Sequence, residues 1–552
     1  MSTSTFDLLA SEDPRGDLEW TNIPRLVEWA AERFGDDEAV VDGDLRLNFV
    51  QLAQRVDEVA RGLIASGFEV GDRAAMWAPN CHEWIVAALG VLRAGGVIVT
   101  LNTRFKGSEA AYIIRSSETK WLLTVSGFLG FDYPAMLVGE DLGSLESIVM
   151  LRGNPEDATA PEALSVISLA DMLATSDTVD PAETARRVAA IASTSISDLI
   201  FTSGTTGRPK GAMTTHAQTL RTFATWASIV GLRRGDRYLV VNPFFHTFGY
   251  KAGLLASLMA GATVIPESVF DVDIVLGRIA EERISMLPGP PTLYQSILSH
   301  PRRSEVDLTS LRLGVTGAAV VPVELVIAMS EELGFETVLT AYGLTESCGV
   351  VTMCRRDDSP EVIATTSGRA IPNLEVRVMN ASGSEVPSGE AGEIVVRGYA
   401  VMEGYFANPE ETTKTIDPEG WLHTGDIGTM DRDGNICITD RLKDMFVVGG
   451  FNAYPAEIEA TIRGFHGVAA VAVIGVPDER MGEVGRAYLV RSTDDPRTDE
   501  EFVEAVLAQS RDAMANYKAP RTAVVIDILP TNASGKVLKR DLRDSYAADH
   551  AN

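Results

Sequence analysis

Residues 199–213 read LIFTSGTTGRPKGAM. A short apolar run, Leu199 to Phe201, opens into residues rich in hydroxyl groups and glycine, with a lysine before Gly211. Glycines let successive backbone N–H groups converge on an anion, hydroxyls add donors, and a lysine adds a compact positive charge. The stretch therefore predicts a strand that leads into a phosphate-binding loop, although its spacing excludes the Walker pattern G-x-x-x-x-G-K-[ST]. The loop candidates are Thr202, Ser203, Gly204, Thr205, Thr206, Gly207 and Lys210.

Composition limits the class of protein. The 552 residues exceed what one hydrophobic core usually serves and predict roughly three to four structural units. An apolar fraction of 45% with 23% charged residues is ordinary for a globular protein. The net charge of −29 would repel nucleic acid and anionic membrane surfaces at long range, so neither is expected as a partner. Any bound anion must therefore be held by local groups.

Cysteine usage and the N-terminal residues indicate a cytoplasmic compartment. Cys81, Cys348, Cys354 and Cys437 show no C-x-x-C spacing, which predicts neither a zinc site nor disulfides. The first twenty residues lack the basic and apolar regions of a secretory signal. The most apolar windows are interrupted by charge or too short to span a bilayer.

Helical and strand patterns alternate from about residue 24 to 330. FVQLAQRVDEVARGLIASG and WIVAALGVLRAG have helical spacing, whereas DRAAMW and VIVTL read as strands. After about residue 365, short strands such as LEVRVMN and GNICITD predict a small β-rich part. The predicted fold class is α/β: a large N-terminal domain of mixed sheets covered by helices, residues 1–440, and a small α+β C-terminal domain, residues 441–552.

The stretch AYGLTES places Tyr342, Thr345 and Glu346 on one loop after a strand-like TVLT. An aromatic ring, a hydroxyl and a carboxylate at one place are suited to stack on a base, contact a phosphate and bind Mg²⁺. A lone glutamate in a loop is more often simply solvated, so this stretch alone leaves both interpretations open.

Three stretches near the C-terminus have simpler alternatives. HTGDIG offers Asp426 as an acceptor for ribose hydroxyls or as an ordinary turn residue. NASGK presents Lys536 at a loop tip, where a plain surface lysine is the alternative. DRDGN has its glycine too early for a calcium loop and predicts a hairpin turn.

Taken in order, these stretches strongly resemble those of the adenylate-forming superfamily of acyl-CoA synthetases, luciferases and adenylation domains. The motifs are TSGTTGRPKGAM, FFHTFG, GAA, YGLTES, TGD, DRLKDMFVVGGFNAYPAEIE and NASGK, which span nearly the whole chain. The resemblance implies an AMP-forming acid–CoA ligase that uses ATP, Mg²⁺ and coenzyme A. The acid attacks the α-phosphorus of ATP and expels pyrophosphate, and the thiol of coenzyme A then displaces AMP.

The resemblance also implies which part of ATP each matched residue contacts. The loop would cradle the β- and γ-phosphates, with Lys210 at its end and Thr202 near the metal. Glu346 would bind Mg²⁺ and Thr345 would contact the α-phosphate. The nucleoside would contact Gly317, Ala318, Ala319, Tyr342, Asp426 and Arg441.

In families of this kind the C-terminal domain moves between the two half-reactions. The resemblance implies that Lys536 bridges the substrate carboxylate and the α-phosphate during adenylation, and that Lys443 is the hinge. Gly449 and Gly450 would then line the tunnel for the pantetheine thiol. The nucleotide of coenzyme A would contact Arg104, Lys518 and Arg521.

FFHTFGYKAG is expected to contribute to the acid pocket. His246 matches a position where the family keeps an aromatic residue or histidine between acyl pocket and thiol tunnel; a histidine packed in the core is the alternative. Lys251 is an unexpected charge, which either turns to solvent at a helix start or meets a polar group of the substrate. The predicted pocket residues are Phe245, Gly249, Tyr250, Lys251, Gly253, Val350 and Val351.

LNTRFKGSEAAYI, TVSGFLGFDYPAML and NPFFHTFGYKAG resemble the actinobacterial CoA ligases that activate the bicyclic propanoate left after steroid rings A and B are removed. This resemblance implies steroid catabolism within lipid metabolism. A medium- or long-chain fatty acid and an aromatic acid remain open as substrates. An acyl-AMP ligase, a luciferase-like oxygenase and a non-catalytic nucleotide-binding relative remain open as activities, and a homodimer as the assembly.

Overall fold

The computed structural model describes residues 20–203, 209–317, 321–441, 444–448, 451–453, 455–478, 481–514, 516–531 and 537–549. The chain forms two compact units. Unit 1 comprises Met1–Val376 and Val396–Leu422, and unit 2 comprises Arg377–Val395 and His423–Asn552. The boundary near Arg441 that the sequence suggests stays a prediction.

The largest sheet of unit 1 has nine strands in the described residues, in the order β19-β10-β9-β4-β3-β5-β7-β8, with β6 paired to β5. From β9 to β8 the paired strands are parallel, whereas β10 pairs antiparallel with both β9 and β19. The strands are β3 (Arg73–Trp77), β4 (Val97–Thr100), β5 (Trp121–Phe128), β6 (Phe131–Asp132), β7 (Ser147–Arg152), β8 (Ser165–Ser168), β9 (Ile196–Ser203), β10 (Pro209–Thr215) and β19 (Gly404–Tyr405).

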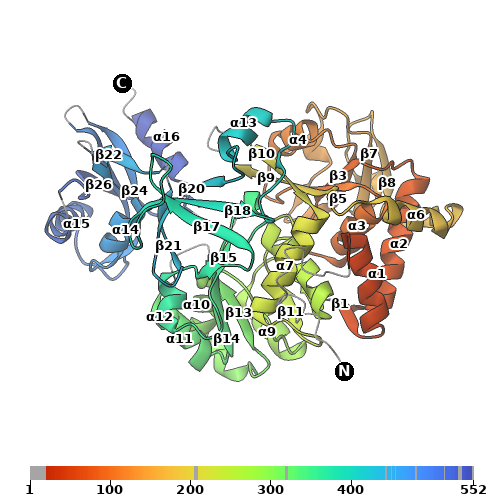
Figure 1. The fold of residues 1–552 in the computed structure, drawn as a ribbon, viewed down its shortest axis with the longest axis horizontal. Coiled ribbons are helices and arrows are strands. Elements are labelled where there is room, and N and C mark those ends of the chain that lie inside the picture. The colour runs from red at the N-terminus through yellow and green to blue at the C-terminus, as the bar shows by residue number, and fades with distance from the viewer. Residues whose placement is uncertain are drawn as a thin grey trace. The chain divides into compact units, whose positions relative to one another are not determined.

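Helix α2 (Phe49–Ala65) illustrates how local sequence fixes an element. Asn48 and Gln51 form a capping box at its start, and Leu52, Val56 and Leu63 are buried at helical spacing. This face packs against α3, and α1 to α3 lie side by side beside the large sheet (Figure 1). The helices up to the phosphate-loop hairpin are α1 (Ile23–Phe34), α2, α3 (His82–Arg93), α4 (Gly107–Ser116), α5 (Leu169–Ala174) and α6 (Pro181–Ala190).

Two four-stranded sheets complete most of unit 1, in the orders β11-β12-β1-β2 and β13-β14-β15-β16. Their strands are β1 (Glu38–Asp42), β2 (Leu45–Asn48), β11 (Arg237–Val240), β12 (Thr263–Pro266), β13 (Leu313–Thr316), β14 (Thr337–Tyr342), β15 (Thr352–Met353) and β16 (Arg369–Ala370). The remaining helices are α7 (His216–Val230), α8 (Ala256–Ala260), α9 (Val272–Glu281), α10 (Pro291–Ser299), α11 (Val323–Glu331), α12 (Pro360–Thr365) and α13 (Pro409–Thr415). A π-helix, Phe248–Leu255, leads directly into α8.

A third four-stranded sheet, β17-β18-β20-β21, contributes residues to both units. Its strands are β17 (Leu374–Met379), β18 (Gly392–Gly398), β20 (Leu422–Met430) and β21 (Ile436–Arg441). The turn between β20 and β21 is the DRDGN hairpin that the sequence predicts, in which the Asp431 carboxylate accepts from the backbone N–H groups of Asp433 and Asn435.

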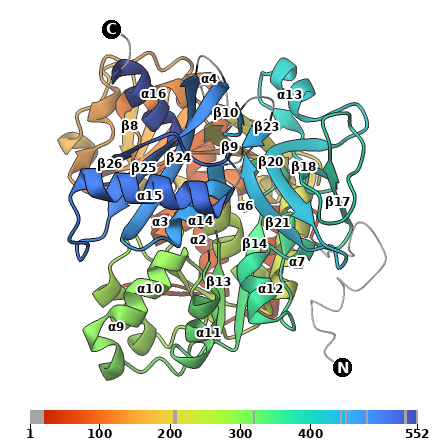
Figure 2. The ribbon, with the colours of Figure 1, turned by 90° about the vertical axis from the view of Figure 1, so that its left-hand side faces the viewer.

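The other sheet of unit 2 has two covered faces. Alternate residues of its long strand β24 point to opposite sides: Val471 and Val473 join the core beneath α14 and α15, and Ile474 joins a second core with Leu542 of α16. Figure 2 shows α14 and α15 lying across these strands. The elements are β22 (Phe446–Val448), β23 (Phe451–Ala453), β24 (Val468–Asp478), β25 (Gly482–Arg491), β26 (Thr522–Val525), α14 (Pro455–Arg463), α15 (Asp499–Ala513) and α16 (Lys539–Asp549).

The predicted α/β class is confirmed, with mixed sheets, a β-rich part and a small α+β part in the expected order. The sequence suggested a helix start near Lys251, whereas the structure has a π-helix that begins at Phe248. Among the described residues, no helix is both long and apolar enough to cross a membrane.

Candidate active site

The phosphate-loop candidates lie where the antiparallel strands β9 and β10 diverge. Thr202 is paired in register with Lys210, and the ladder continues without interruption to the pair Asp198 and Thr214. Gly204, Thr205, Thr206 and Gly207 lie outside the described residues. The hairpin therefore holds Thr202 and Lys210 on two paired strands, whereas the sequence predicted a single strand leading into a loop that contains both residues.

The Glu346 carboxylate lies against the stem of this loop. Glu346 is on a single turn of 3₁₀-helix, Thr345–Ser347, that follows β14. Its Oε1 accepts hydrogen bonds from the Thr202 hydroxyl and from the Tyr405 hydroxyl, each at 2.9 Å. A carboxylate held by two hydroxyls offers the all-oxygen environment that Mg²⁺ prefers.

Lys210 is largely buried, with 8% of its side chain exposed, and forms an ion pair with Glu411 at the start of α13. Its ammonium also lies 5.2 Å from the centre of the Tyr405 ring. Glu411 in turn accepts from Lys414 at 2.9 Å. The phosphate-binding lysine of the prediction is thus already paired with a carboxylate.

These contacts shift the pKa values of Tyr405 and Glu411. Desolvation and the neighbouring Glu346 carboxylate raise the pKa of Tyr405 well above its usual range, so Tyr405 remains a hydrogen-bond donor at neutral pH. The ammonium of Lys210, followed by that of Lys414, holds the pKa of Glu411 below its ordinary value. Glu411 is therefore ionised at neutral pH.

The predicted nucleoside residues are divided between the units. In unit 1, Gly317 follows β13 and the almost buried Tyr342 ends β14, while Ala318 and Ala319 lie outside the described residues. In unit 2, Asp426 and Arg441 are direct partners across β20 and β21. The Asp426 side chain is 3% exposed and lies within a strand, so it is not a plain turn aspartate.

His246 precedes the π-helix and is solvent-exposed, so its side chain is not packed in the core. Its Nδ1 accepts from the backbone N–H of Phe248 at 3.2 Å, which leaves Nε2 to carry the proton of a neutral ring. The gating role remains a prediction.

The π-helix explains why glycine occurs at residue 249. A Cβ on Gly249 would lie 2.2 Å from the carbonyl oxygen of Pro243. Phe245 is half-buried, and Gly249, Tyr250, Lys251, Gly253, Val350 and Val351 are buried. Their role as the acid pocket stays a prediction.

The interpretation that Lys251 turns to solvent is wrong. Lys251 is 1% exposed, and its Nζ lies 2.9 Å from Oδ1 of Asp198, which has no exposed surface. The residue is in the middle of the π-helix and not at a helix start, so its charge points into the core.

The remaining predicted residues lie in several places. Arg104 is exposed in the loop before α4. Lys518, which packs beside Tyr517, and the exposed Arg521 lie in the segment before β26 in unit 2. Ser203 ends β9. Lys443, Gly449, Gly450 and Lys536 lie outside the described residues.

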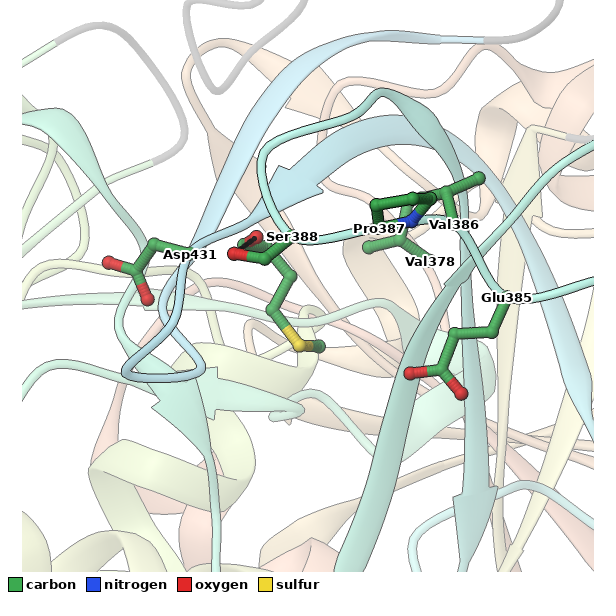
Figure 3. Close-up of a pocket in the computed structure, with 7 residues that line it drawn as sticks. Val378, Glu385, Val386, Pro387, Ser388 and Asp431 are labelled. Carbon is green, nitrogen blue, oxygen red and sulfur yellow. Dashed lines mark hydrogen bonds between the residues drawn. The ribbon is translucent and has the colours of Figure 1, made fainter.

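Two other features of the structure resemble sites. A cavity of about 90 Å³ lies in unit 2. Figure 3 shows Val378, Val386 and Pro387 together, with the carboxylates of Glu385 and Asp431 on opposite sides. Pockets that bind small molecules usually have volumes of about 300 Å³ and above, so this cavity is smaller than an ordinary ligand site. None of the predicted site residues lines it.

In unit 1, Asp42, His82 and Glu83 are close enough to share a cation. The guanidinium of Arg152 already bonds Asp42 at 3.3 Å and Glu83 at 2.7 Å. This arginine supplies the positive charge that the two carboxylates require.

Tyr405, Glu411 and Asp198 were not predicted from the sequence. Tyr405 and Glu411 lie in GYFANPEET, where a Pro at the first helical turn predicts a helix start but gives no contact with Lys210. Asp198 carries a signal, because it is a charge inside the apolar strand ISDLIF, and an internal charge requires a partner.

The comparisons with known proteins agree with this site. A family model for AMP-binding enzyme matches residues 27–406, and a model for AMP-binding enzyme C-terminal domain matches residues 457–536. The chain belongs to the family of AMP-binding enzymes. The two matches place the phosphate-loop hairpin and Glu346 in the first region and Lys536 at the end of the second.

Relatives of this AMP-binding enzyme are similar over almost its whole length. A 3-[(3aS,4S,7aS)-7a-methyl-1,5-dioxo-octahydro-1H-inden-4-yl]propanoyl:CoA ligase from Rhodococcus jostii strain RHA1 is 48% identical over 95% of this chain and 98% of its own. The enzyme of the same name from Mycobacterium tuberculosis H37Rv is 45% identical over the same shares. The solved structure of the anthranilate CoA ligase AuaEII with anthranoyl-AMP has a TM-score of 0.81 at 26% identity, over 97% of this chain and 99% of that one.

The sequence expectation of an AMP-forming acid–CoA ligase is confirmed. ATP and coenzyme A are substrates of the family. The acid itself, the metal and the individual roles of the site residues belong to the proposal that follows.

Proposed function

We propose that this acid–CoA ligase activates a fused bicyclic propanoate with two ring ketones, a steroid-derived acid. The observation that carries the proposal is the 48% identity, over nearly the full length of both chains, to a ligase named for such an acid. The second relative named for the same acid supports it at 45% identity.

The first half-reaction requires a carboxylate oxygen to bond to the α-phosphorus while the bond from that phosphorus to the β-phosphate bridge oxygen breaks. Both reactants are anions, so positioning and charge neutralisation supply most of the catalysis. Lys210 and Thr202, on the two stems of the loop, are assigned to the phosphates that leave. Thr345 is assigned to the α-phosphate, and Lys536 to the substrate carboxylate and the α-phosphate.

Mg²⁺ fits the donor set around Glu346. The Glu346 carboxylate and the Thr202 hydroxyl are hard oxygen ligands that lie 2.9 Å apart. When bound, the ion would neutralise phosphate charge. The protein's own part is to hold the Glu346 carboxylate in place through Thr202 and Tyr405.

The second half-reaction forms a thioester. The sulfur of coenzyme A bonds to the acyl carbon, the bond from that carbon to the AMP oxygen breaks, and the thiol proton is released to solvent. Lys443 is assigned as the hinge, Gly449 and Gly450 to the pantetheine tunnel, and Arg104, Lys518 and Arg521 to the nucleotide of coenzyme A. His246, whose neutral ring lies before the π-helix, is assigned to the junction between acid and thiol.

Two buried donors support a substrate with ketone groups. The Trp226 indole N–H and the Thr247 hydroxyl have no hydrogen-bond partner within the described part of the chain. Thr247 adjoins His246 in the predicted pocket segment. The Trp226 ring packs edge-on against Phe248 of the same segment, with 6.1 Å between the ring centres. Buried donors of this kind select for an acceptor, because they would otherwise stay unpaired.

The test is a panel of carboxylic acids with ATP and Mg²⁺, following pyrophosphate and thioester with and without coenzyme A. The panel contains the bicyclic dioxo propanoate, octanoate and ferulate. We expect kcat/KM for the bicyclic acid to exceed that for octanoate by about 100-fold or more. Equal values for the two acids would overturn the substrate assignment.

A matched pair of variants separates pocket shape from hydrogen bonding. Thr247→Val keeps the size of the side chain and removes the hydroxyl. We expect it to lower kcat/KM for the dioxo acid by roughly tenfold while leaving octanoate within about twofold. Thr247→Ser, which keeps the hydroxyl, should retain the preference for the dioxo acid, and a Thr247→Val enzyme with an unchanged preference would contradict this role.

A further inference from the structure

Lys251 is the most deeply buried positive charge described in the predicted acid-pocket segment. Its side chain is 1% exposed and forms an ion pair with Asp198, which is completely buried. Burial acts to lower the pKa of Lys251, but the Asp198 carboxylate outweighs burial and the pKa lies above the ordinary value. The Lys251 side chain is therefore protonated at neutral pH. A buried charge of this kind is costly to separate from its partner.

Four segments of unit 1 meet at this ammonium. The Nζ of Lys251 lies 2.7 Å from the Thr214 hydroxyl and 3.7 Å from the Cys348 sulfur. Oδ1 of Asp198 also accepts from the Thr214 hydroxyl at 2.6 Å, and Oδ2 accepts from Ser197 at 2.7 Å. The lysine thus joins β9, β10, the π-helix and the turn that follows Glu346.

Three of these segments lead directly to the assigned ATP contacts. Asp198 and Thr214 are cross-strand partners in the ladder that ends at Thr202 and Lys210. At about 3.3 Å per residue, that ladder is about 13 Å long. On the third segment, Cys348 closes the turn of Glu346 in a left-handed conformation with φ of 56°.

The fourth segment leads to the assigned acid contacts. Lys251 lies within the π-helix that begins two residues after His246. Short π-helices are rare and occur frequently at functional sites. The neighbouring Gly349 is packed so closely on Thr247 that a Cβ there would lie 2.3 Å from the Thr247 methyl group. Acid-pocket and nucleotide segments are therefore in direct contact around the ion pair.

We infer that Lys251 is a positioning residue that couples occupation of the acid pocket to the geometry of the ATP site. This inference rests on the proposed function, because it takes the π-helix as a wall of the acid pocket. A displacement of the π-helix by bound acid must carry the ammonium with it. Since Asp198 and Thr214 cannot be left unpaired in the core, the β9–β10 hairpin must move together with the ammonium. We expect acid and ATP to strengthen each other's binding, and linkage makes the effect equal in both directions.

The test uses the double variant Lys251→Met with Asp198→Asn in the full chain. It removes both charges together. The amide oxygen of the asparagine keeps an acceptor for the Thr214 hydroxyl, and the Ser197 hydroxyl keeps the carbonyl oxygen of Thr214 as its acceptor. We expect its thermal midpoint to stay within roughly 5 °C of the wild type, since paired removal avoids an isolated buried charge. Lys251→Met alone should lower the midpoint further, because it leaves the Asp198 carboxylate unpaired.

The matched control is another buried ion pair of unit 1, Arg312 with Asp236, whose side chains are 8% and 4% exposed. Arg312 precedes β13 and Asp236 precedes β11, so both lie at the opposite ends of these strands from Gly317. The double variant Arg312→Met with Asp236→Asn should change stability without changing the coupling of acid and ATP.

The measurement is the Kd of α,β-methylene-ATP, with and without the best acid of the panel; this analogue cannot transfer its adenylyl group to the acid. We expect the acid to tighten nucleotide binding in the wild type by about fivefold or more and in the Lys251/Asp198 double variant by less than twofold. In pyrophosphate exchange the same variant should show a raised KM for ATP with a smaller change in kcat.

Two outcomes would overturn the inference: no coupling in the wild type, or undiminished coupling in the Lys251/Asp198 double variant. Failure of the proposed substrate is seen separately, because acyl-CoA formation by the wild-type preparation is measured first. A wild type that uses octanoate as well as the bicyclic acid would remove the substrate assignment while leaving the coupling test valid.

Discussion

The ammonium of Lys210 is ion-paired with the carboxylate of Glu411, and both side chains are largely buried. ATP phosphates would compete with this carboxylate for the same ammonium. Because a preoccupied site reduces apparent affinity, Glu411→Gln should lower the Kd of MgATP by about fivefold. The control is Glu410→Gln, since Glu410 is 80% exposed and bonds Lys414 instead. Weaker ATP binding by Glu411→Gln would show that Glu411 orients Lys210 and does not compete.

The Tyr405 hydroxyl donates to the same oxygen of Glu346 as Thr202 does. Tyr405→Phe removes that donor and leaves the carboxylate less constrained. A hydrogen bond to a charged group contributes about 1.5–3 kcal/mol, so adenylation should slow by roughly tenfold and require more Mg²⁺ for half-saturation. Pyrophosphate exchange across a Mg²⁺ series measures both effects. Tyr294→Phe, which removes a buried hydroxyl bonded to Leu287, should leave the Mg²⁺ dependence unchanged.

Asp426 and Arg441 face each other across β20 and β21. If Asp426 accepts from the ribose hydroxyls, Asp426→Ala should raise KM for ATP by roughly 10- to 100-fold and leave KM for the acid unchanged. Thr429→Ala, in the same strand opposite Cys437, is the control. Equal increases in both KM values would point to damage of the hairpin.

His216 predicts an acid-sensitive step in stability. It is 2% exposed, its Nδ1 accepts from the backbone N–H of Ile23, and Asp198 and Lys251 are its nearest charged neighbours. Burial, with a further contribution from Lys251, lowers its pKa from 6.5 to about 4. Between these two pH values, the unfolded chain binds a proton at His216 and the folded chain does not. The free energy of unfolding therefore falls as the pH drops from about 6.5 to about 4.

His216→Asn should flatten this part of the stability profile. The variant keeps an acceptor for Ile23 and has no titrating ring. The expected result is a smaller difference in thermal midpoint between pH 7 and pH 5 than in the wild type, whatever the variant's midpoint at pH 7. His300→Asn, at a less buried histidine beside Asp273, should keep the wild-type difference.

The roles assigned to Lys536 and Lys443 can be tested by measuring the two half-reactions separately. Lys536→Ala should abolish pyrophosphate exchange yet spare thioester formation from a supplied acyl-adenylate. Lys443→Pro should slow thioester formation far more than adenylation, because proline restricts the backbone rotation of a hinge. Equal loss of both half-reactions in either variant would refute the corresponding assignment.

Periodicity predicted most of the fold because each element buries a regular face. The helical spacing of FVQLAQRVDEVARGLIASG became α2, and the predicted strand LEVRVMN became β17. Similarly, Thr202 and Lys210 were predictable as loop residues, because they bracket a glycine-rich turn.

Long-range pairings could not be predicted in the same way. Thr202 and Glu346 are separated by 144 residues, and only the folded chain brings them to hydrogen-bonding distance. The resemblance to known enzymes assigned both to the nucleotide, but no spacing rule gave the Tyr405 or Glu411 contacts. Lys251 and Asp198 carried a weaker signal, since each is a charge inside an apolar run.

The π-helix at Phe248–Leu255 has a consequence for changing which acid the enzyme accepts. A π-helix is an α-helix with one residue in excess, and an α-helix turns by about 100° per residue. Deleting a single residue between Gly249 and Gly253 would let this segment wind as an ordinary helix. The side chains before the deletion would then rotate as a block against those after it. Length variation here, more than point substitution, offers a route to new acid specificity.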